Sequence, residues 1–156
     1  MQLVRWIIAA AHVLAGSAWF GAMLYSLTVL HPRARTFFGS PRPFEEFIAH
    51  IAAGARWKVL SGAAFVALTG IGLLLMLSAE KTSTLRNPCI VAKSVLFVIT
   101  ISLFCFTSWR LWPARTLASA EEIPKFQQTF RRIAVTLLVL VGLNIVLGVL
   151  SSHFGN

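Results

Sequence analysis

The chain has 156 residues, of which 57% are hydrophobic and only 12% charged, and its mean hydropathy is +0.77. This composition argues against a water-soluble domain. The 14 basic residues outnumber 5 acidic ones, but they cluster at the ends of long uncharged segments. That pattern is typical of membrane topology and excludes a nucleic-acid-binding surface.

Four segments are long and apolar enough to cross a hydrocarbon core of roughly 30 Å, which takes about 20 helical residues. They cover about residues 4–30, 57–79, 88–110 and 132–152. The third carries Lys93 about one turn inside its start, from where a flexible side chain brings the ammonium to the surface. The sequence therefore predicts an all-α fold, an integral membrane up-and-down four-helix bundle in a single transmembrane domain.

An amphipathic helix is predicted over about residues 42–55, between the first two spans. Ser40 followed by Pro41 marks its start, and apolar residues then recur at helical spacing. This pattern indicates a helix at the membrane interface. A second start signal, Ser119 ahead of two glutamates, precedes the fourth span.

The basic residues predict the orientation of the bundle. Ten of them flank the loops after the first and third spans, and four lie on the other side. The ten are Arg33, Arg35, Arg42, Arg56, Lys58, Arg110, Arg115, Lys125, Arg131 and Arg132; the four are Arg5, Lys81, Arg86 and Lys93. The positive-inside rule then places both termini outside the cytoplasm, and we expect the protein in a bacterial inner membrane.

Two ionisable residues lie inside the predicted spans, His12 and Lys93, and such residues are functional candidates because they are costly there. His153, after the fourth span, belongs to the same side of the membrane as His12. Two imidazoles at one depth on facing helices clamp a haem iron in helix bundles. His12 and His153 are therefore candidate haem ligands, with His12 as a buried hydrogen-bonded histidine the plainer alternative.

The other two histidines, His31 and His50, lie on the basic side and are candidates for a second haem. Against this, His31 before Pro32 is expected to cap the C-terminus of the first helix, and His50 to lie on a solvated face. Lys93 and Arg86 are cations that would lie near the propionates of an outer haem.

The segment from His12 to Arg35, HVLAGSAWFGAMLYSLTVLHPRAR, resembles the first helix of the four-span unit of the copper resistance protein D (CopD) family and the related HemJ group. A tryptophan follows the histidine by seven positions, at Trp19. Further likeness lies in ALTG at 67–70, in Lys93, and in FRRIAV at 130–135. HemJ-like proteins are haem-containing protoporphyrinogen oxidases, so this resemblance implies a haem ligand at His12; CopD-like proteins are associated with copper uptake or tolerance.

The leading hypothesis is a CopD-like membrane protein that binds haem b, one or two per chain, and transfers electrons as an oxidoreductase component. Its expected partners are membrane lipid, a quinol or a partner redox protein, and further subunits of a complex or a second copy of the chain. One alternative is copper transport or resistance, with Met76 near the outer end of the second span as a soft ligand. The other alternative is a structural subunit without a cofactor.

Overall fold

The computed structural model of the chain describes residues 2–79, 88–119 and 121–153, and for residues 77–79, 152 and 153 it describes the backbone alone. All regular structure in these ranges is helical, which confirms the all-α fold. In chain order the elements are α1 (Gln2–Tyr25), the π-helix η1 (Ser26–Leu30), α2 (His31–Phe38), α3 (Pro41–Ala52), α4 (Ala55–Ala79), α5 (Pro88–Phe106), the π-helix η3 (Thr107–Leu111), α6 (Trp112–Thr116) and α7 (Ile123–His153).

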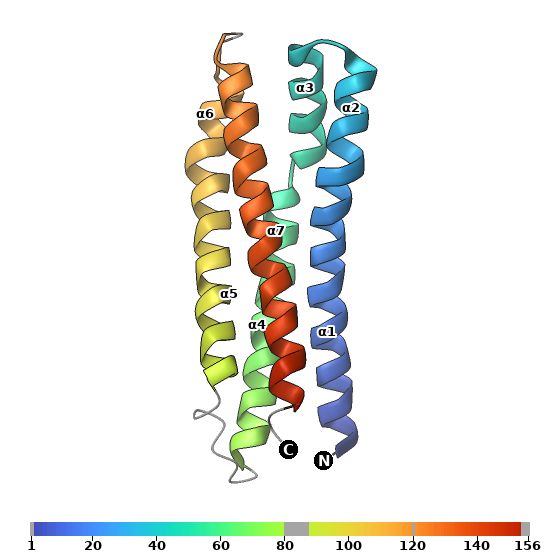
Figure 1. Cartoon of the computed structure of the whole chain (residues 1–156), viewed down its shortest axis with the longest axis vertical. Coiled ribbons are helices and arrows are strands. Elements are labelled where there is room, and N and C mark those ends of the chain that lie inside the picture. The colour runs from blue at the N-terminus through green and yellow to red at the C-terminus, as the bar shows by residue number, and fades with distance from the viewer. Residues whose placement is uncertain (1, 80–87, 120, 154–156) are drawn as a thin grey trace.

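These elements join into four long helices side by side, as Figure 1 shows, with α7 in front of α4 in that view. The start of α1 and the end of α7 lie at one end of the bundle, here called the terminal end, and α2, α3 and α6 lie at the other, here called the basic end. Four helical stretches have the length and hydropathy of membrane spans: Gln2–Phe38, Ala55–Met76, Pro88–Thr116 and Ile123–Ser151. The predicted up-and-down bundle is therefore observed.

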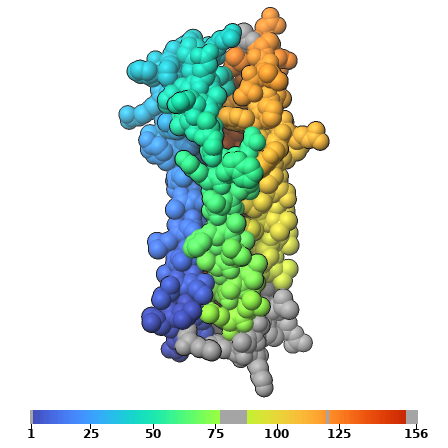
Figure 2. Space-filling view, turned by 180° about the vertical axis from the view of Figure 1, so that it is seen from behind, coloured from blue at the N-terminus to red at the C-terminus, as the bar shows by residue number. Residues whose placement is uncertain are grey.

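Apolar side chains cover the outside of the bundle. Leu14, Leu68 and Val98 are 70%, 69% and 62% exposed. Seen from behind in Figure 2, the outer surface of α4 lies between those of α1 and α5. A bundle that presents leucine and valine outward along its length is stable only in lipid, so the chain is an integral membrane protein.

The first helix extends eight residues beyond the predicted end of its span. Pro32 has no N–H for the helix to use, and the π-helical turn at Ser26–Leu30 lets the chain continue around it. The helix ends instead at Gly39, whose positive φ of 63° suits glycine and whose N–H donates to the Arg35 carbonyl. The prediction that His31 caps the C-terminus of this helix is therefore wrong.

Helix α3 forms a hairpin with α2 and runs along the bundle axis at the basic end (Figure 1). Ser40 and Pro41 begin it, as predicted, and it ends at Ala52. Phe44 and Ile48 on its apolar face are 3% and 4% exposed because they pack against Ala34 of α2. The predicted amphipathic character is observed, and the apolar face packs on protein.

Candidate functional site

The His12 side chain on α1 points at α4. Its Nδ1 atom lies 2.9 Å from the Thr69 hydroxyl oxygen. The same hydroxyl lies 2.8 Å from the Phe65 carbonyl oxygen and 3.1 Å from that of Val66, one turn earlier in α4. The histidine thus reaches a helix 57 residues away in sequence through a polar contact within the membrane.

This hydrogen-bond network is compatible with one tautomer of His12 in particular. A threonine hydroxyl has one hydrogen, and two carbonyls of its own helix lie within hydrogen-bond distance of the Thr69 hydroxyl. When Thr69 donates to one of these carbonyls, its Oγ1 accepts the hydrogen bond from His12, and the imidazole hydrogen is on Nδ1. The lone pair then lies on Nε2, the ring atom a metal would bind.

Glycine at position 70 makes room for the ring. A Cβ at Gly70 would lie 3.2 Å from Cε1 of His12 and 3.7 Å from Nδ1, so any side chain would press on the imidazole. Helices α1 and α4 approach closely here, as small residues allow in membranes. The ring is therefore held by Thr69 on one edge and by the α4 backbone on one side.

Lys93 on α5 lies against α7 in the same manner. A Cβ built on Gly148 would be 2.9 Å from Lys93 Nζ, so the ammonium occupies the space that a larger residue would fill. One turn along α7, the Asn144 amide lies against the α5 backbone. In the amide orientation that satisfies both groups, its nitrogen donates to the Lys93 carbonyl at 3.1 Å and its oxygen accepts from the Phe97 N–H at 3.2 Å. These contacts fix α5 against α7 next to the lysine.

The two contact points lie at nearly one depth. Phe20 of α1 touches Gly142 of α7, where a Cβ would be 3.3 Å from its ring. Helices α1 and α7 are antiparallel, so His12, eight residues before Phe20, lies level with Leu150, eight residues after Gly142. At 1.5 Å per residue, Leu150 is about 3 Å along the axis from Gly148. The Lys93 ammonium, which lies against Gly148, and the His12 imidazole therefore lie at similar depths in the bundle.

We call the four polar side chains at these two helix contacts the polar cluster. It consists of His12, Thr69, Lys93 and Asn144, one from each membrane span. In the described ranges, the carboxylates all belong to the basic end, in α3 or before α7, far from the cluster. The cluster therefore combines a neutral nitrogen donor with a cation that has no carboxylate partner among the described residues.

The predicted partners of His12 are placed as follows. His153 is the last residue of α7, three residues beyond the level of His12, which is about 5 Å along the axis. Its side chain and all of Arg86 lie outside the described residues. Met76 lies seven residues beyond Thr69 in α4, about 10 Å from the level of His12 toward the terminal end.

His31 and His50 lie at the basic end but do not meet. The His31 ring packs edge-on against Phe44, with 5.9 Å between ring centres, and is half-buried inside the α2–α3 hairpin. His50 in the last turn of α3 is exposed. No contact in the described part of the chain joins the two imidazoles, and an inner haem between them remains a prediction.

A second polar network, at the basic end, is not anticipated by the sequence. Arg115 of α6 is 8% exposed and donates twice to Glu45 of α3, from Nε to Oε2 at 2.7 Å and from Nη2 to Oε1 at 3.0 Å. The Gln127 amide of α7 donates to the same Glu45 oxygen at 2.8 Å and accepts from Arg35 of α2. The Glu45 carboxylate thus ties α3 to α6 and α7, and Gln127 extends the network to α2.

Aromatic rings cover the buried guanidinium of this network. Arg115 Cζ lies 4.6 Å from the ring centre of Phe130 and 5.2 Å from that of Trp112. Cation–π contacts and a bidentate carboxylate together satisfy a charge in an apolar setting. The sequence does not reveal this pairing, because the partners are 70 and 82 residues apart. They come together only where the four helices pack in the structure.

Among the described residues, no group of three or more His, Cys, Asp or Glu side chains could hold a metal ion. Ligation by a single imidazole, with further support from a cation, is the arrangement that the polar cluster offers.

No family model, curated protein or solved structure matches the chain. The resemblance to the CopD and HemJ proteins thus rests on the quoted motifs alone. The fold and the polar cluster define the chain as a four-span helical membrane protein with an intramembrane histidine–lysine site.

Proposed function

We propose that the protein binds haem b in the membrane and transfers electrons, with His12 as an axial ligand of the iron. The observation that carries this proposal is the hydrogen bond between His12 Nδ1 and the Thr69 hydroxyl. Ligating histidines almost always donate their second ring N–H to a partner, which fixes the ring and raises the basicity of the other nitrogen. Thr69 fulfils that role here and leaves the Nε2 lone pair for iron.

Lys93 supports an anionic porphyrin in particular. Haem carries two propionates, and an ammonium within a membrane span needs a counter-charge. Lys93 Nζ lies against Gly148, at nearly the depth of His12, with no carboxylate partner in the described ranges. In this proposal Lys93 holds a propionate and His12 orients the iron, and Arg86 is a second candidate for a propionate.

The chemistry that such a cofactor supplies is the gain and loss of one electron. His153 is the proposed second ligand, because the end of α7 lies within one helical turn of the His12 depth. A quinol in the membrane is the proposed donor, and a partner redox protein or a neighbouring subunit is the acceptor. We place the basic end in the cytoplasm of a bacterial inner membrane and both termini outside.

The experiment is a reduced-minus-oxidised absorption spectrum of the full chain purified from haem-replete cells. We expect the α-band of a low-spin b-type centre, lost in His12→Ala and weakened in Lys93→Gln. His50→Ala, at the exposed far end, asks separately whether a second haem exists and should leave the α-band of the outer centre in place. A colourless protein, or a His12→Ala variant with the parent spectrum, would contradict the proposal.

Thr69→Val separates ligation from folding. This variant keeps the ligand and the shape of α4 but removes the hydrogen-bond acceptor of Nδ1, so the haem should remain with a shifted reduction potential. One equivalent of copper per chain without porphyrin, lost in Met76→Leu, would replace the haem proposal by the copper alternative. A folded protein with neither cofactor would favour a structural subunit.

A further inference from the structure

A pocket of about 530 Å³ opens at the basic end between the α2–α3 hairpin and the first turns of α7. Its polar walls come from separate elements: Arg35 of α2, Ser40 at the start of α3, and Gln127, Gln128 and Arg131 of α7. The volume is that of an ordinary small-molecule site. The polar cluster of the proposed haem site lies far from it, in the other half of the bundle.

The charged residues that line this pocket are all positive. Arg35 and Arg131 line it, and no aspartate or glutamate does. Among the described residues, neither arginine forms an ion pair with a carboxylate: Glu45 is engaged by Arg115, and Glu46 pairs with Arg42. The pocket therefore presents two uncompensated guanidinium groups, together with amide and hydroxyl donors, to whatever enters it.

The network beneath the pocket positions these donors. Glu45 accepts from the Gln127 nitrogen, so the Gln127 oxygen faces Arg35 and accepts from its Nη2. The Arg35 guanidinium also lies over the Phe44 ring, at 5.8 Å from its centre. With one nitrogen and one face held by protein, the remaining N–H groups of Arg35 are available to the pocket in a fixed orientation.

One helix start adds to the positive potential. Pro41, which lines the pocket, begins the twelve-residue helix α3. Helix N-termini carry partial positive charge and favour anions. The guanidinium and amide N–H groups and this helix N-terminus form a donor set that matches the tetrahedral oxygens of a phosphate.

We infer that this pocket binds a phosphate group, and that its source is the headgroup of an anionic phospholipid. The pocket lies where the apolar spans end: Arg35 follows the uncharged segment 6–32, and Arg131 precedes the uncharged segment 133–156. A lipid headgroup lies at that depth in a bilayer by necessity. The volume exceeds that of a lone phosphate and accommodates a phosphodiester with its attached alcohol.

The test uses the full chain in detergent and its thermal unfolding midpoint. Short-chain phosphatidylglycerol, short-chain phosphatidylcholine and inorganic phosphate are titrated separately at constant ionic strength. We expect phosphatidylglycerol to raise the midpoint at lower concentration than phosphatidylcholine, because the choline cation is repelled by the two arginines. Arg131→Gln should weaken the apparent affinity for phosphatidylglycerol about tenfold, as the loss of a charge-assisted contact predicts.

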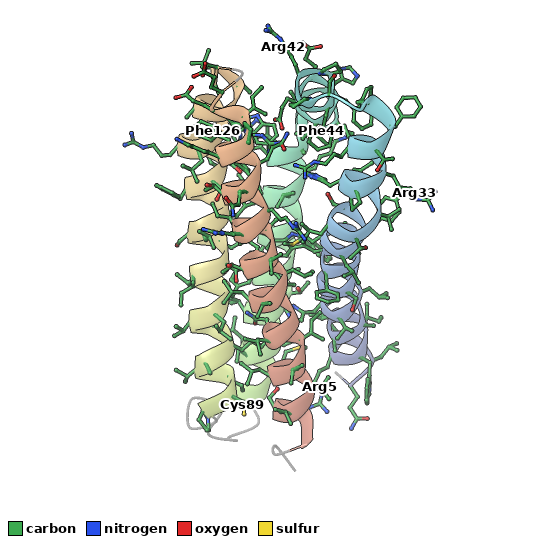
Figure 3. All side chains as sticks on the ribbon, turned by 45° about the horizontal axis from the view of Figure 1, so that its top comes forward. Arg5, Arg33, Arg42, Phe44, Cys89 and Phe126 are labelled. Atoms are coloured by element: carbon green, nitrogen blue, oxygen red, sulfur yellow. The ribbon has the colours of Figure 1, made fainter. Side chains whose placement is uncertain are left out.

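The chain supplies matched controls for both arginines. Arg132 is next to Arg131, equally exposed and outside the pocket, so Arg132→Gln changes net charge by the same amount without touching the site. Arg33→Gln is the matched control for Arg35→Gln, because Arg33 lies outside the pocket. Figure 3 shows the Arg33 side chain directed away from the bundle. Arg131 makes no hydrogen bond within the described ranges, so Arg131→Gln keeps the test valid even where Arg35→Gln unfolds the hairpin.

The outcomes decide the inference. A loss of affinity for phosphatidylglycerol that is confined to Arg35→Gln and Arg131→Gln supports the site. Equal losses in Arg131→Gln and Arg132→Gln, or no stabilisation by any phosphate compound, would overturn it, because the attraction would then be general or absent. Stabilisation by inorganic phosphate at the same concentration as the lipid, with the same dependence on Arg131, would overturn the lipid as the source and identify a soluble phosphate compound.

Discussion

The Arg56 guanidinium of α4 donates a hydrogen bond from Nη2 to the main-chain carbonyl of Ser108 in η3, across 2.9 Å. This carbonyl lacks a main-chain donor for a local reason. In the π-helical turn the Trp112 N–H bonds to Thr107, so Ser108 would need the N–H of residue 113, which is a proline. Arg56 replaces the missing N–H and allows the third span to continue through Pro113 to Thr116.

Replacing Arg56 by methionine should therefore leave a carbonyl unsatisfied in an apolar setting. We expect the free energy of unfolding to fall by about 1–3 kcal/mol, measured by denaturant titration in detergent micelles. Pro113→Ala should rescue most of this loss, because it restores a backbone N–H. Equal costs of Arg56→Met with and without Pro113→Ala would show that the arginine acts only through its stacking on Trp109, 4.8 Å from Cζ.

The Arg115–Glu45 pair predicts a large effect of charge removal. Its side chains are only 6% and 16% exposed. Arg115→Leu would therefore leave the Glu45 carboxylate without its guanidinium partner, and we expect the free energy of unfolding to fall by about 3 kcal/mol. The control is the pair Arg42–Glu46 on the outer face of α3, 3.6 Å apart and 82% and 72% exposed. Glu46→Gln should change stability by less than about 0.5 kcal/mol. Similar costs at the two pairs would contradict the assignment of Arg115 as a structural anchor.

The turn before α7 predicts a pH dependence. Glu122 Oε2 accepts hydrogen bonds from the Ser119 N–H and hydroxyl, both at 3.0 Å, and these bonds lower the pKa of the Glu122 carboxyl. A lowered folded-state pKa adds stability that is present above the unfolded value, near 4.3, and is lost as the pH falls through the folded value. The unfolding midpoint of Glu122→Gln should thus fall less steeply on acidification than that of the parent. Ser119→Ala, which removes the hydroxyl donor to Glu122, should reduce the pH dependence in the same direction.

The proposed orientation predicts which positions are reached from outside the cell. In a cysteine-free background, Ser83→Cys between the second and third spans should react with a membrane-impermeant maleimide on intact cells. Ala118→Cys in the loop after α6 should react only after permeabilisation. The positive-inside rule gives this result because, in the sequence, ten basic residues flank the loops after the first and third spans and four belong to the opposite side. The reverse labelling pattern would invert the topology.

Hydropathy alone predicts the four spans and the up-and-down arrangement, because the absence of charge over 20 residues reflects a requirement of the bilayer and not of packing. The ends of the first and third spans are not predictable in this way. Pro32 and Pro113 are typical of helix termini, but in the structure a π-helical turn precedes each of them and the helix continues. A π-turn depends on tertiary partners such as Arg56, which local pattern does not contain.

The same distinction applies to the candidate sites. His12 and Lys93 are recognisable from sequence as ionisable residues within apolar segments. Their pairing with Thr69 and Gly148 is not, because which turn of α4 or α7 lies opposite depends on the register of whole helices. Small residues such as Gly70 and Gly148 are local signals of a close helix contact, but they do not identify the partner.

Gly70 offers the sharpest test of the geometry around His12. The added methyl group of Gly70→Ala would lie 3.2 Å from His12 Cε1, so the ring must shift by a few tenths of an ångström and strain its hydrogen bond to Thr69. We expect a loss of about 1–3 kcal/mol in unfolding free energy, as for other overpacked sites. Gly72→Ala is the matched control, because nothing lies within 4 Å of its new Cβ. That variant should be neutral or more stable by up to about 1 kcal/mol, since alanine favours the helix.

A double-mutant cycle identifies the ring as the cause. In a His12→Ala background the space beside Gly70 is free, so Gly70→Ala should lose its penalty and become as favourable as Gly72→Ala. The difference between the two backgrounds measures the contact between residue 70 and the imidazole. An unchanged penalty in the absence of the ring would mean that the α1 and α4 backbones themselves collide. His12 would then not pack on Gly70 as described, and its tautomer and ligand role would lose their structural basis.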